Sequence, residues 1–359
     1  MKIGFLHTPD DLRCPISAIS LKKYQKIGVS VLAESKALTN SDEELEGKEG
    51  IEIASRKDIL SQSDIVYCNT PLSPSELKKL NKDAIVVSFY APFNPENKMD
   101  TLKGSDVKAF SMDMIPRTTL AQSMDVLSSM ASISGYKAVL LSAEKLPRYF
   151  PMMMTAAGTV KPAQVLILGA GVAGLQAIAT ARKLGAKVQV FDVRKAVKEE
   201  VQSLGAKFVE VDGSSDDKAA GGYAIEQSED YQQRQKEAIH NSVKLADVVI
   251  TTAQLRGREA PILVTKAMVE DMKAGSVIID LASSTGGNCE VTKDNEEIKH
   301  NGVTVIGDSA LYNKAIIDAS SLLANNIHNY VATFVKEGAM NVDMENEIIS
   351  GSLVHPKSE

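Results

Sequence analysis

The chain has 359 residues, a length typical of two domains of ordinary size. Hydrophobic residues make up 44% and charged residues 24%, and the net charge of −6 argues against nucleic acid or an anionic membrane surface as a partner. The three cysteines, Cys14, Cys68 and Cys289, are widely spaced and odd in number. We therefore expect no disulfide framework and no metal site, and we infer a reducing, cytoplasmic setting.

The first half of the chain alternates short apolar runs with helical stretches. We predict strands at residues 2–6, 29–32, 64–67, 85–89 and 107–110, with helical segments such as 74–80 between them. The apolar run at the N-terminus is too short for a signal peptide and is interpreted as the first strand. This alternation predicts a parallel sheet with helices on its faces.

A long helix without a neighbouring strand is predicted from about residue 123 to residue 146, and polar residues gather at its start. They supply a cation, an amide, a carboxylate and a hydroxyl, from Arg117, Gln122, Asp125 and Ser128. The last three are spaced three apart, so on a helix they would share one face, suited to a carboxamide or a ribose. The alternative is a capped, solvated first helical turn with Ser123 as its cap.

The most informative pattern begins with a buried strand predicted at residues 165–168. Gly169, Gly171 and Gly174 follow in the spacing G-x-G-x-x-G, and an uncharged helical run continues to residue 181. The first glycine allows a tight turn, the second lets the backbone approach a pyrophosphate, and the third lets helix and strand pack closely. The pyrophosphate would lie at the helix N-terminus, beside Val172 and Ala173, where free N–H groups favour negative charge.

A second strand at 188–191 ends in Asp192, close to the expected ~20 residues after the glycine loop. A carboxylate there binds both hydroxyls of an adenosine ribose and repels a 2′-phosphate, which favours NAD(H) over NADP(H). The alternative is a Rossmann-like domain that has lost its ligand. The uncharged run 162–181 is not interpreted as a membrane span, because its four glycines and prolines fit a strand–turn–helix pattern.

Further strands are predicted at 207–211, 247–251, 276–280 and 303–306, which completes the six of a full dinucleotide fold. The polar segment 212–223 after the third strand is interpreted as a lid, hinged at Gly221 and Gly222, with Tyr223 capping the cofactor. An ordinary surface insertion is the alternative.

A second long helix, at about 313–335, would return the chain to its first domain, and the tail 337–359 is interpreted as an arm. The predicted fold is α/β, with two Rossmann-like doubly wound parallel-sheet domains joined by long linking helices. The domains are 1–125 plus 322–359, and 126–321. A ligand is expected between them.

An acid or base for proton transfer is missing from these patterns. A dehydrogenase acting on an alcohol or amine must move a proton as well as a hydride. None of the five histidines accompanies the glycine loop or the polar helix start, and His328 is interpreted as a hydrogen-bonded, partly buried residue.

Several motifs together resemble one family over nearly the whole chain. They lie at 88–96, 168–181, 192–194, 221–224, 275–282, 286–289 and 347–354, with the polar loop of Arg117, Gln122, Asp125 and Ser128. The chain resembles the NAD(H)-binding component, domain I, of proton-translocating nicotinamide nucleotide transhydrogenase, as a separate alpha subunit. The 192–194 motif adds Val193 and Arg194 to the expected cofactor-binding residues.

The resemblance implies direct hydride transfer from NADH to NADP+, with NADP(H) held by a beta subunit and a membrane subunit coupling the transfer to proton movement. It implies that the four polar-loop residues orient the nicotinamide. It also implies a homodimer that reaches the inner face of the cell membrane only through its partners. Two rings exchanging a hydride need proximity and exclusion of water rather than a base.

The chain departs from the family pattern at Leu120, Met130, Ser132 and Ser284. The nearest relative in fold is alanine dehydrogenase, whose lysine position holds Asn69 here and whose histidine position falls near Ala91 or Pro92. Two alternatives stay open at this point. One is an amino-acid dehydrogenase of the alanine type, and the other is an NAD-sensing binding module without hydride transfer.

Overall fold

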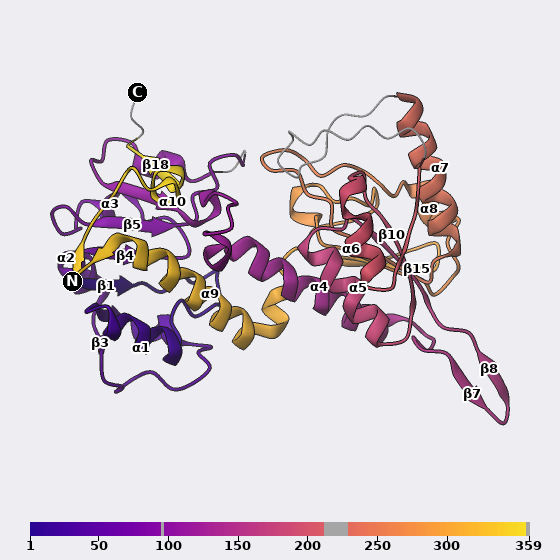
Figure 1. The fold of residues 1–359 in the computed structure, drawn as a ribbon, viewed down its shortest axis with the longest axis horizontal. Helices are drawn as coiled ribbons and strands as arrows, with labels where there is room; N and C mark the ends of the chain where they lie inside the picture. Colours follow the sequence, from indigo (N-terminus) through magenta and orange to yellow (C-terminus); the bar gives the residue numbers. More distant parts are fainter. Residues whose placement is uncertain (95–96, 212–228, 357–359) are drawn as a thin grey trace. The chain divides into compact units, whose positions relative to one another are not determined.

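The computed structural model describes residues 1–94, 97–211 and 229–356 and divides into two compact units (Figure 1). Unit 1 is Met1–Met130 with Ala315–Glu359, and unit 2 is Ala131–Lys314. The predicted boundaries fall at the start of α4 (Val126–Lys145) and inside α9 (Ile316–Val331). The predicted lid, with Gly221, Gly222 and Tyr223, lies outside the described residues.

Unit 1 contains a seven-stranded sheet in the order β18-β6-β5-β4-β1-β2-β3. All neighbours are parallel except β18, which pairs antiparallel with β6. The strands are β1 (Lys2–Phe5), β2 (Ser30–Ala33), β3 (Ile51–Ile53), β4 (Ile65–Tyr67), β5 (Ile85–Ser88), β6 (Lys108–Ser111) and β18 (Leu353–His355). The other helices are α1 (Ala18–Lys26), α2 (Arg56–Gln62), α3 (Pro74–Leu77) and α10 (Glu347–Ser352), and a small ribbon pairs β16 (Val335–Lys336) with β17 (Ala339–Met340).

The tail of the chain is part of the unit 1 fold rather than an arm. Its strand β18 adds to the edge of the sheet at β6, and α10 precedes it (Figure 1). Ile348 and Ile349 are buried, and the Tyr330 hydroxyl on α9 meets the Ser352 hydroxyl at 2.6 Å. Burial of these apolar side chains explains why the segment stays with the unit.

Unit 2 contains a second seven-stranded sheet, in the order β11-β10-β9-β12-β13-β15-β14, parallel except for β14. Its strands are β9 (Gln164–Leu168), β10 (Lys187–Phe191), β11 (Lys207–Phe208), β12 (Val248–Thr251), β13 (Val277–Asp280), β14 (Glu297–His300) and β15 (Val303–Gly307). Its other helices are α5 (Val172–Lys183), α6 (Lys198–Ser203), α7 (Glu229–Leu245) and α8 (Lys266–Glu270). Without its antiparallel edge strand, each sheet has the strand order 3-2-1-4-5-6 of a dinucleotide fold, which confirms the predicted fold class.

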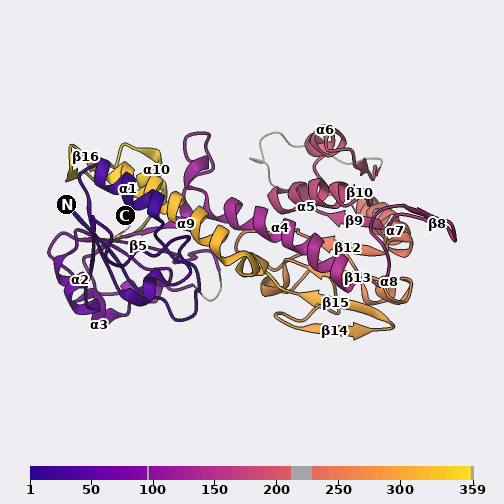
Figure 2. The same ribbon diagram turned by 90° about the horizontal axis from the view of Figure 1, so that it is seen from below.

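Strand β9 shows why both faces of the unit 2 sheet are covered. Val165 and Ile167 belong to a core cluster shared with α5, whereas Leu166 and Leu168 belong to one shared with α7 and α8. Successive side chains of a strand point to opposite faces, so an unbroken apolar run is buried on both. Helices α5 and α6 lie side by side on one face of this sheet (Figure 2).

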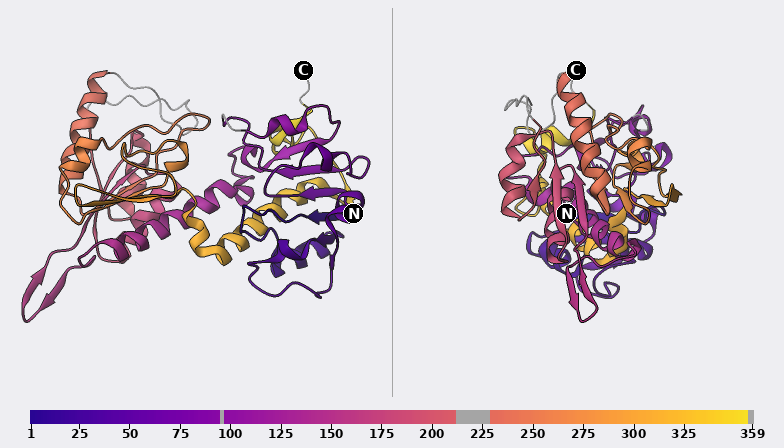
Figure 3. Two further views of the ribbon diagram at one scale, coloured as in Figure 1. Left: turned by 180° about the vertical axis from the view of Figure 1, so that it is seen from behind. Right: turned by 90° about the vertical axis from the view of Figure 1, so that its right-hand side faces the viewer.

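A two-stranded hairpin, β7 (Met153–Thr155) with β8 (Gly158–Val160), projects from unit 2 (Figures 1 and 3). Its residues are mostly exposed: the exposed fraction is 58% at Met152 and 75% at Met154. Sequence patterning did not predict this hairpin, because both strands are short and do not alternate apolar with polar residues.

Helix α4 is, within the described part of the chain, the one helix long and apolar enough to cross a membrane by length and composition. A buried core helix passes the same test. Ala138 and Val139 of α4 are fully buried in the core of unit 2, and 44% of the apolar window of this helix is buried. The run 162–181, for which a membrane span was excluded, forms β9 and most of α5.

Candidate functional site

The glycine loop lies at the carboxyl end of β9, where the strand order of unit 2 reverses. Gly169 has φ +107°, and a Cβ there would lie 2.4 Å from Thr252 Oγ1. A Cβ on Gly174 would lie 1.9 Å from Gly169 O, so only glycine lets α5 approach the strand this closely. Around Gly171, by contrast, a Cβ would meet no heavy atom of the described residues within 4 Å. The three glycines thus have three different environments, as the sequence predicts.

The N-terminus of α5 is open to a ligand. Gly171 is the N-cap residue, no side chain caps the helix, and no acidic residue stands in its first turn. Val172 is 44% exposed at the first helical position. N–H groups at such a helix end favour an anion. The space beside Gly171 and this uncapped helix end fit the pyrophosphate of a dinucleotide.

Asp192 follows β10 directly and is tied to the glycine loop. Its Oδ2 accepts a hydrogen bond from Ala170 N at 2.7 Å, and its Oδ1 accepts one from Arg194 N at 2.8 Å. The guanidinium of Arg194 also covers it, with Nε 2.9 Å from Oδ1 and Nη2 2.8 Å from Oδ2. Val193, between them, packs against the core. The predicted ribose-binding carboxylate is therefore at the correct edge of the sheet, but it is paired.

Sequence analysis gave no role to the two loops that follow β12 and β13 beside the glycine loop. Asn288 is fully buried, and its amide binds both the N–H and the carbonyl of Ala253, at 2.9 and 2.8 Å. Asp280 accepts hydrogen bonds from the N–H groups of Asn288 and Cys289 and from the Thr292 hydroxyl. These bonds fix the loop that carries Thr252. The available signal was the motif at 286–289, to which the sequence alone assigned no function.

Gly135 of α4 is a second residue that sequence analysis missed. A Cβ at Gly135 would lie 2.1 Å from the carbonyl oxygen of Ala173 and 2.8 Å from its carbonyl carbon. Helix α4 therefore packs directly on the first turn of α5, where the glycine spacing predicts an anion site. A glycine inside a helix lowers the stability of the helix by about 1 kcal/mol relative to alanine. A glycine at such a position in a predicted helix therefore indicates a close packing contact, and this was the signal available in the sequence.

The polar segment before α4 belongs to unit 1 and does not form one helix face, contrary to prediction. Gln122 lies in the 3₁₀ turn η4 (Gln122–Met124), Asp125 is extended, and α4 begins at Val126. Asp125, rather than Ser123, caps α4: its Oδ1 accepts from Ser128 N at 2.9 Å and its Oδ2 from the Ser128 hydroxyl at 2.6 Å. A capping residue needs a non-helical backbone, which breaks the helix between Gln122 and Ser128.

The same segment is held from α9, a support that sequence analysis did not predict. Asn326 and Asn329 donate their amides to the carbonyl of Ser123, at 2.8 and 3.1 Å. Arg117 is exposed in the preceding loop, and a Cβ on Gly351 of α10 would lie 2.6 Å from a ring carbon of Pro116. The loop that presents Arg117, Gln122 and Asp125 is therefore fixed by the C-terminal part of the chain.

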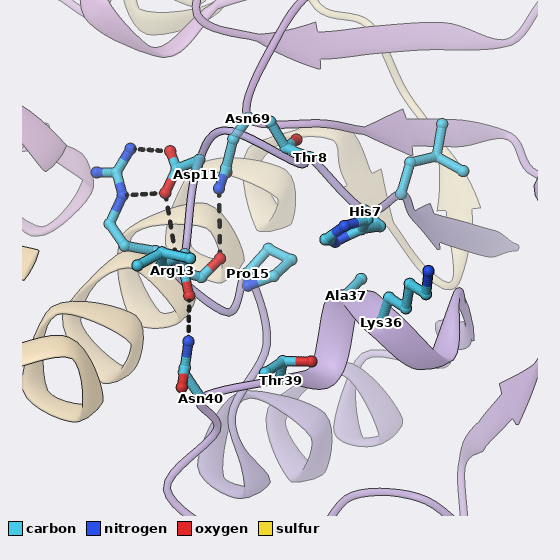
Figure 4. Close-up of a pocket in the computed structure, with 12 residues that line it drawn as sticks. His7, Thr8, Asp11, Arg13, Pro15, Lys36, Ala37, Thr39, Asn40 and Asn69 are labelled. Carbon is cyan, nitrogen blue, oxygen red and sulfur yellow. Dashed lines mark hydrogen bonds and ion pairs between the residues drawn. The ribbon is translucent and has the colours of Figure 1, made fainter.

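Unit 1 has a pocket of about 150 Å³ at the carboxyl ends of β1 and β4, where its own strand order reverses (Figure 4). Asp11 holds the guanidinium of Arg13, with Nε 2.9 Å from Oδ1. Asn69 accepts a hydrogen bond from the Tyr67 hydroxyl at 2.7 Å and donates to the Arg13 carbonyl. His7 is also in the lining. No group of metal-ligating side chains occurs among the described residues.

The residues at which the chain departs from the family pattern lie in different settings. Leu120 is 76% exposed, beside the polar loop, whereas Met130 is buried in α4 and Ser132 half-buried. Ser284 is exposed, and its N–H donates to the Ser309 hydroxyl at 2.9 Å. None of these positions disturbs the glycine loop.

Comparisons with known proteins agree with this geometry. Residues 7–134 match the N-terminal domain, and residues 138–359 the C-terminal domain, of alanine dehydrogenase/PNT. An NAD(P) transhydrogenase alpha-subunit chain from Rhodospirillum rubrum is 38% identical over 358 residues, covering 96% of this chain and 93% of that protein.

Among solved structures, transhydrogenase from Sinorhizobium meliloti is similar over 98% of this chain and 97% of that chain, with a TM-score of 0.84 and 36% identity. An L-alanine dehydrogenase structure covers 98% of this chain, with a TM-score of 0.75 and 22% identity. The second likeness shows the fold alone.

Proposed function

The chain belongs to the alanine dehydrogenase/PNT family and groups with the NAD(P) transhydrogenase alpha subunits, and we propose that it is the NAD(H)-binding subunit of a proton-translocating transhydrogenase. The observation that carries this proposal is the glycine loop of unit 2, with its open helix N-terminus and Asp192 bonded to the loop at Ala170. In the proposal, a beta subunit holds NADP(H) and a membrane subunit couples the reaction to protons.

Different residues of unit 2 would bind different parts of NAD(H). The backbone at Gly171, Val172 and Ala173 would bind the pyrophosphate, because the N–H groups of this helix end have no capping side chain. Asp192 would bind the adenosine ribose. When bound, the reduced nicotinamide supplies a hydride, which NADP+ on the partner subunit accepts. The hydride step itself requires no proton transfer to or from either nicotinamide ring.

The polar loop of unit 1 has a positioning role in this proposal. Asp125 and Ser128 are held by their mutual hydrogen bonds and by the cap of α4, so their geometry is fixed before a ligand arrives. Arg117 and Gln122 are exposed on the same loop. Such preorganised groups orient a carboxamide and keep water from it, which is the main requirement of a direct hydride transfer.

The unit 1 pocket gives little support to amino-acid chemistry. Asn69, at the position of the alanine dehydrogenase lysine, is a carboxamide whose oxygen and nitrogen are both hydrogen-bonded. A carboxamide does not exchange a proton near neutral pH, so it cannot replace a lysine as acid or base. Asp11 already neutralises the cation of Arg13.

A reconstituted assay tests the proposed function. The purified chain is mixed with the NADP(H)-binding component of a related transhydrogenase, and hydride exchange between NADH and an NADP+ analogue is measured. We expect exchange, and no oxidation of L-alanine and no reduction of pyruvate with ammonia. Alanine oxidation would establish the dehydrogenase alternative, and NADH binding without exchange would establish the sensor alternative.

The proposal includes a homodimer, and the exposed methionines of the hairpin support it. A hairpin that projects apolar side chains is suited to a second copy of the chain. The double variant Met152→Ser/Met154→Ser should be monomeric by light scattering at micromolar concentration, where the unsubstituted chain is dimeric. Leu245→Ser, which removes a leucine 63% exposed on α7, is the matched control and should stay dimeric. A dimer that survives both changes would exclude the hairpin as the interface.

A further inference from the structure

In this structure the carboxylate of Asp192 is fully hydrogen-bonded, so a ribose binds it only by displacing the Arg194 guanidinium. A carboxylate has about four acceptor positions. Two are taken by the backbone N–H groups of Ala170 and Arg194, and two by the guanidinium of Arg194. The two guanidinium N–H groups bind the two oxygens side by side, as the two hydroxyls of a ribose would.

Arg194 is the more exposed member of its ion pair with Asp192. The side chain of Arg194 is 29% exposed, whereas that of Asp192 is 6% exposed. The backbone donors come from the glycine loop and from the turn after β10, so they cover the carboxylate from within the fold. A nucleotide that reaches this carboxylate therefore also meets the cation of Arg194.

The charges of Asp192 and Arg194 determine how strongly the site distinguishes NADH from NADPH. A bare carboxylate repels the 2′-phosphate of NADP(H), which carries up to about two negative charges. With Arg194 paired to it, the net charge of the two side chains is zero. A guanidinium also binds phosphate through two parallel N–H groups, so it can transfer from Asp192 to a 2′-phosphate without leaving the pocket edge.

We infer that Arg194 is a specificity-determining residue of the nucleotide site, because its guanidinium neutralises Asp192 and gives the site a measurable affinity for NADP(H). The inference rests on the proposed NAD(H) site in unit 2. The unsubstituted chain prefers NADH through Asp192, and Arg194 limits that preference.

Calorimetric titrations with NADH and with NADPH test the role of Arg194 without any activity assay. Arg194→Gln should weaken NADPH binding at least about tenfold, the effect of losing hydrogen bonds to a charged group, while NADH binding changes less than about threefold. Arg194→Lys keeps a cation and should retain most of the NADPH affinity. Lys198→Gln is the matched control. Lys198 lies at the start of α6 and pairs with Glu210 at 2.8 Å, so this variant should leave the ratio of the two affinities unchanged.

The outcomes separate this inference from the proposed function. If the unsubstituted chain binds neither nucleotide, the proposed function fails. If it binds NADH but no NADPH, or if Arg194→Gln widens the ratio of the NADPH to the NADH dissociation constant by less than about threefold, the inference is overturned. If Lys198→Gln widens the ratio of affinities equally, the inference is also overturned. The effect would then come from the loss of any positive charge in unit 2 and not from Arg194 itself. Circular dichroism of each variant confirms that it is folded.

Discussion

Two glycines only three residues apart should respond differently to alanine, one in stability and the other in NADH binding. At Gly174 a Cβ would lie 1.9 Å from Gly169 O, and real Cβ atoms essentially never approach closer than 3.0 Å, so α5 must move by about 1 Å or more. Overpacking of this kind costs about 1–3 kcal/mol. In a domain the size of unit 2 each kcal/mol lowers the melting temperature by about 2–4 °C.

Gly171→Ala is the matched partner of this change. No atom lies within 4 Å of its Cβ, and the backbone at φ −79°, ψ −169° suits any residue. Loss of the glycine N-cap and the lower entropy of the unfolded chain are each worth about 0.5–1 kcal/mol, with opposite signs. The stability should therefore hardly change. The added methyl instead occupies the space for the pyrophosphate, and NADH affinity should fall about 10- to 100-fold.

Calorimetric melting and NADH fluorescence titration of both variants measure the two effects. We expect a lower melting temperature for Gly174→Ala, and an unchanged melting temperature with weak NADH binding for Gly171→Ala. NADH affinity equal to that of the unsubstituted chain in Gly171→Ala would show that the pyrophosphate does not lie at this helix end. An unchanged melting temperature in Gly174→Ala would refute the packing argument.

Four further predictions follow from the same contacts. Asp192→Asn should narrow the preference for NADH over NADPH about tenfold in calorimetry, because it removes the negative charge that neutralises Arg194 beside a 2′-phosphate; an unchanged preference would exclude Asp192 from the ribose site. Arg117→Ala and Asp125→Asn should each lower hydride exchange about 100-fold, the cost of a misplacement of about 1 Å, with NADH affinity kept within about threefold. Asparagine is also a good helix cap, so Asp125→Asn should melt as the unsubstituted chain does, and full exchange rates would reduce both residues to surface and capping roles. His7→Gln should leave exchange within about twofold because no proton moves, and a large loss would favour acid–base chemistry in the unit 1 pocket. Burial lowers the pKa of His328, so the unfolded chain binds more protons and stability should fall as the pH drops below about 6.5; His328→Gln should flatten this slope in thermal melts between about pH 5 and 7, and parallel slopes would refute it.

The central parallel strands could be predicted from sequence because each is an apolar run between turn residues. Three of the four edge strands could not, whereas β11 (Lys207–Phe208) lies within the strand predicted at 207–211. β3 has only three residues, β14 has a single apolar residue, Ile298, and β18 lies in a segment with a polar composition. Edge strands gain less from burial, so their sequences carry a weaker signal. β18 also pairs with a strand more than 200 residues away, which no local pattern encodes.

In the candidate site, too, local sequence patterns could be predicted and long-range contacts could not. The glycine loop and Asp192 are local patterns, and the structure places them as the spacing predicts. The three-residue spacing predicts one helix face for Gln122, Asp125 and Ser128, with a Ser123 cap as the alternative. The Asp125 carboxylate instead caps α4 and interrupts that helix. His328 was expected to be hydrogen-bonded, but only its Nδ1 meets a partner, Asn329, and its Nε2 has none among the described residues. Asn288 depends on contacts across loops, which sequence spacing does not reveal.

The most direct test of direct hydride transfer follows the hydrogen itself. NADH carrying deuterium at the transferred position of the nicotinamide ring is mixed with the chain, the NADP(H)-binding component of a relative and NADP+, in ordinary water. Mass spectrometry of the NADPH formed then reports the label. Transfer between two rings without an exchangeable carrier predicts that the NADPH retains the deuterium. NADPH that contains solvent hydrogen instead, or no NADPH at all from a mixture that binds NADH, would contradict the account.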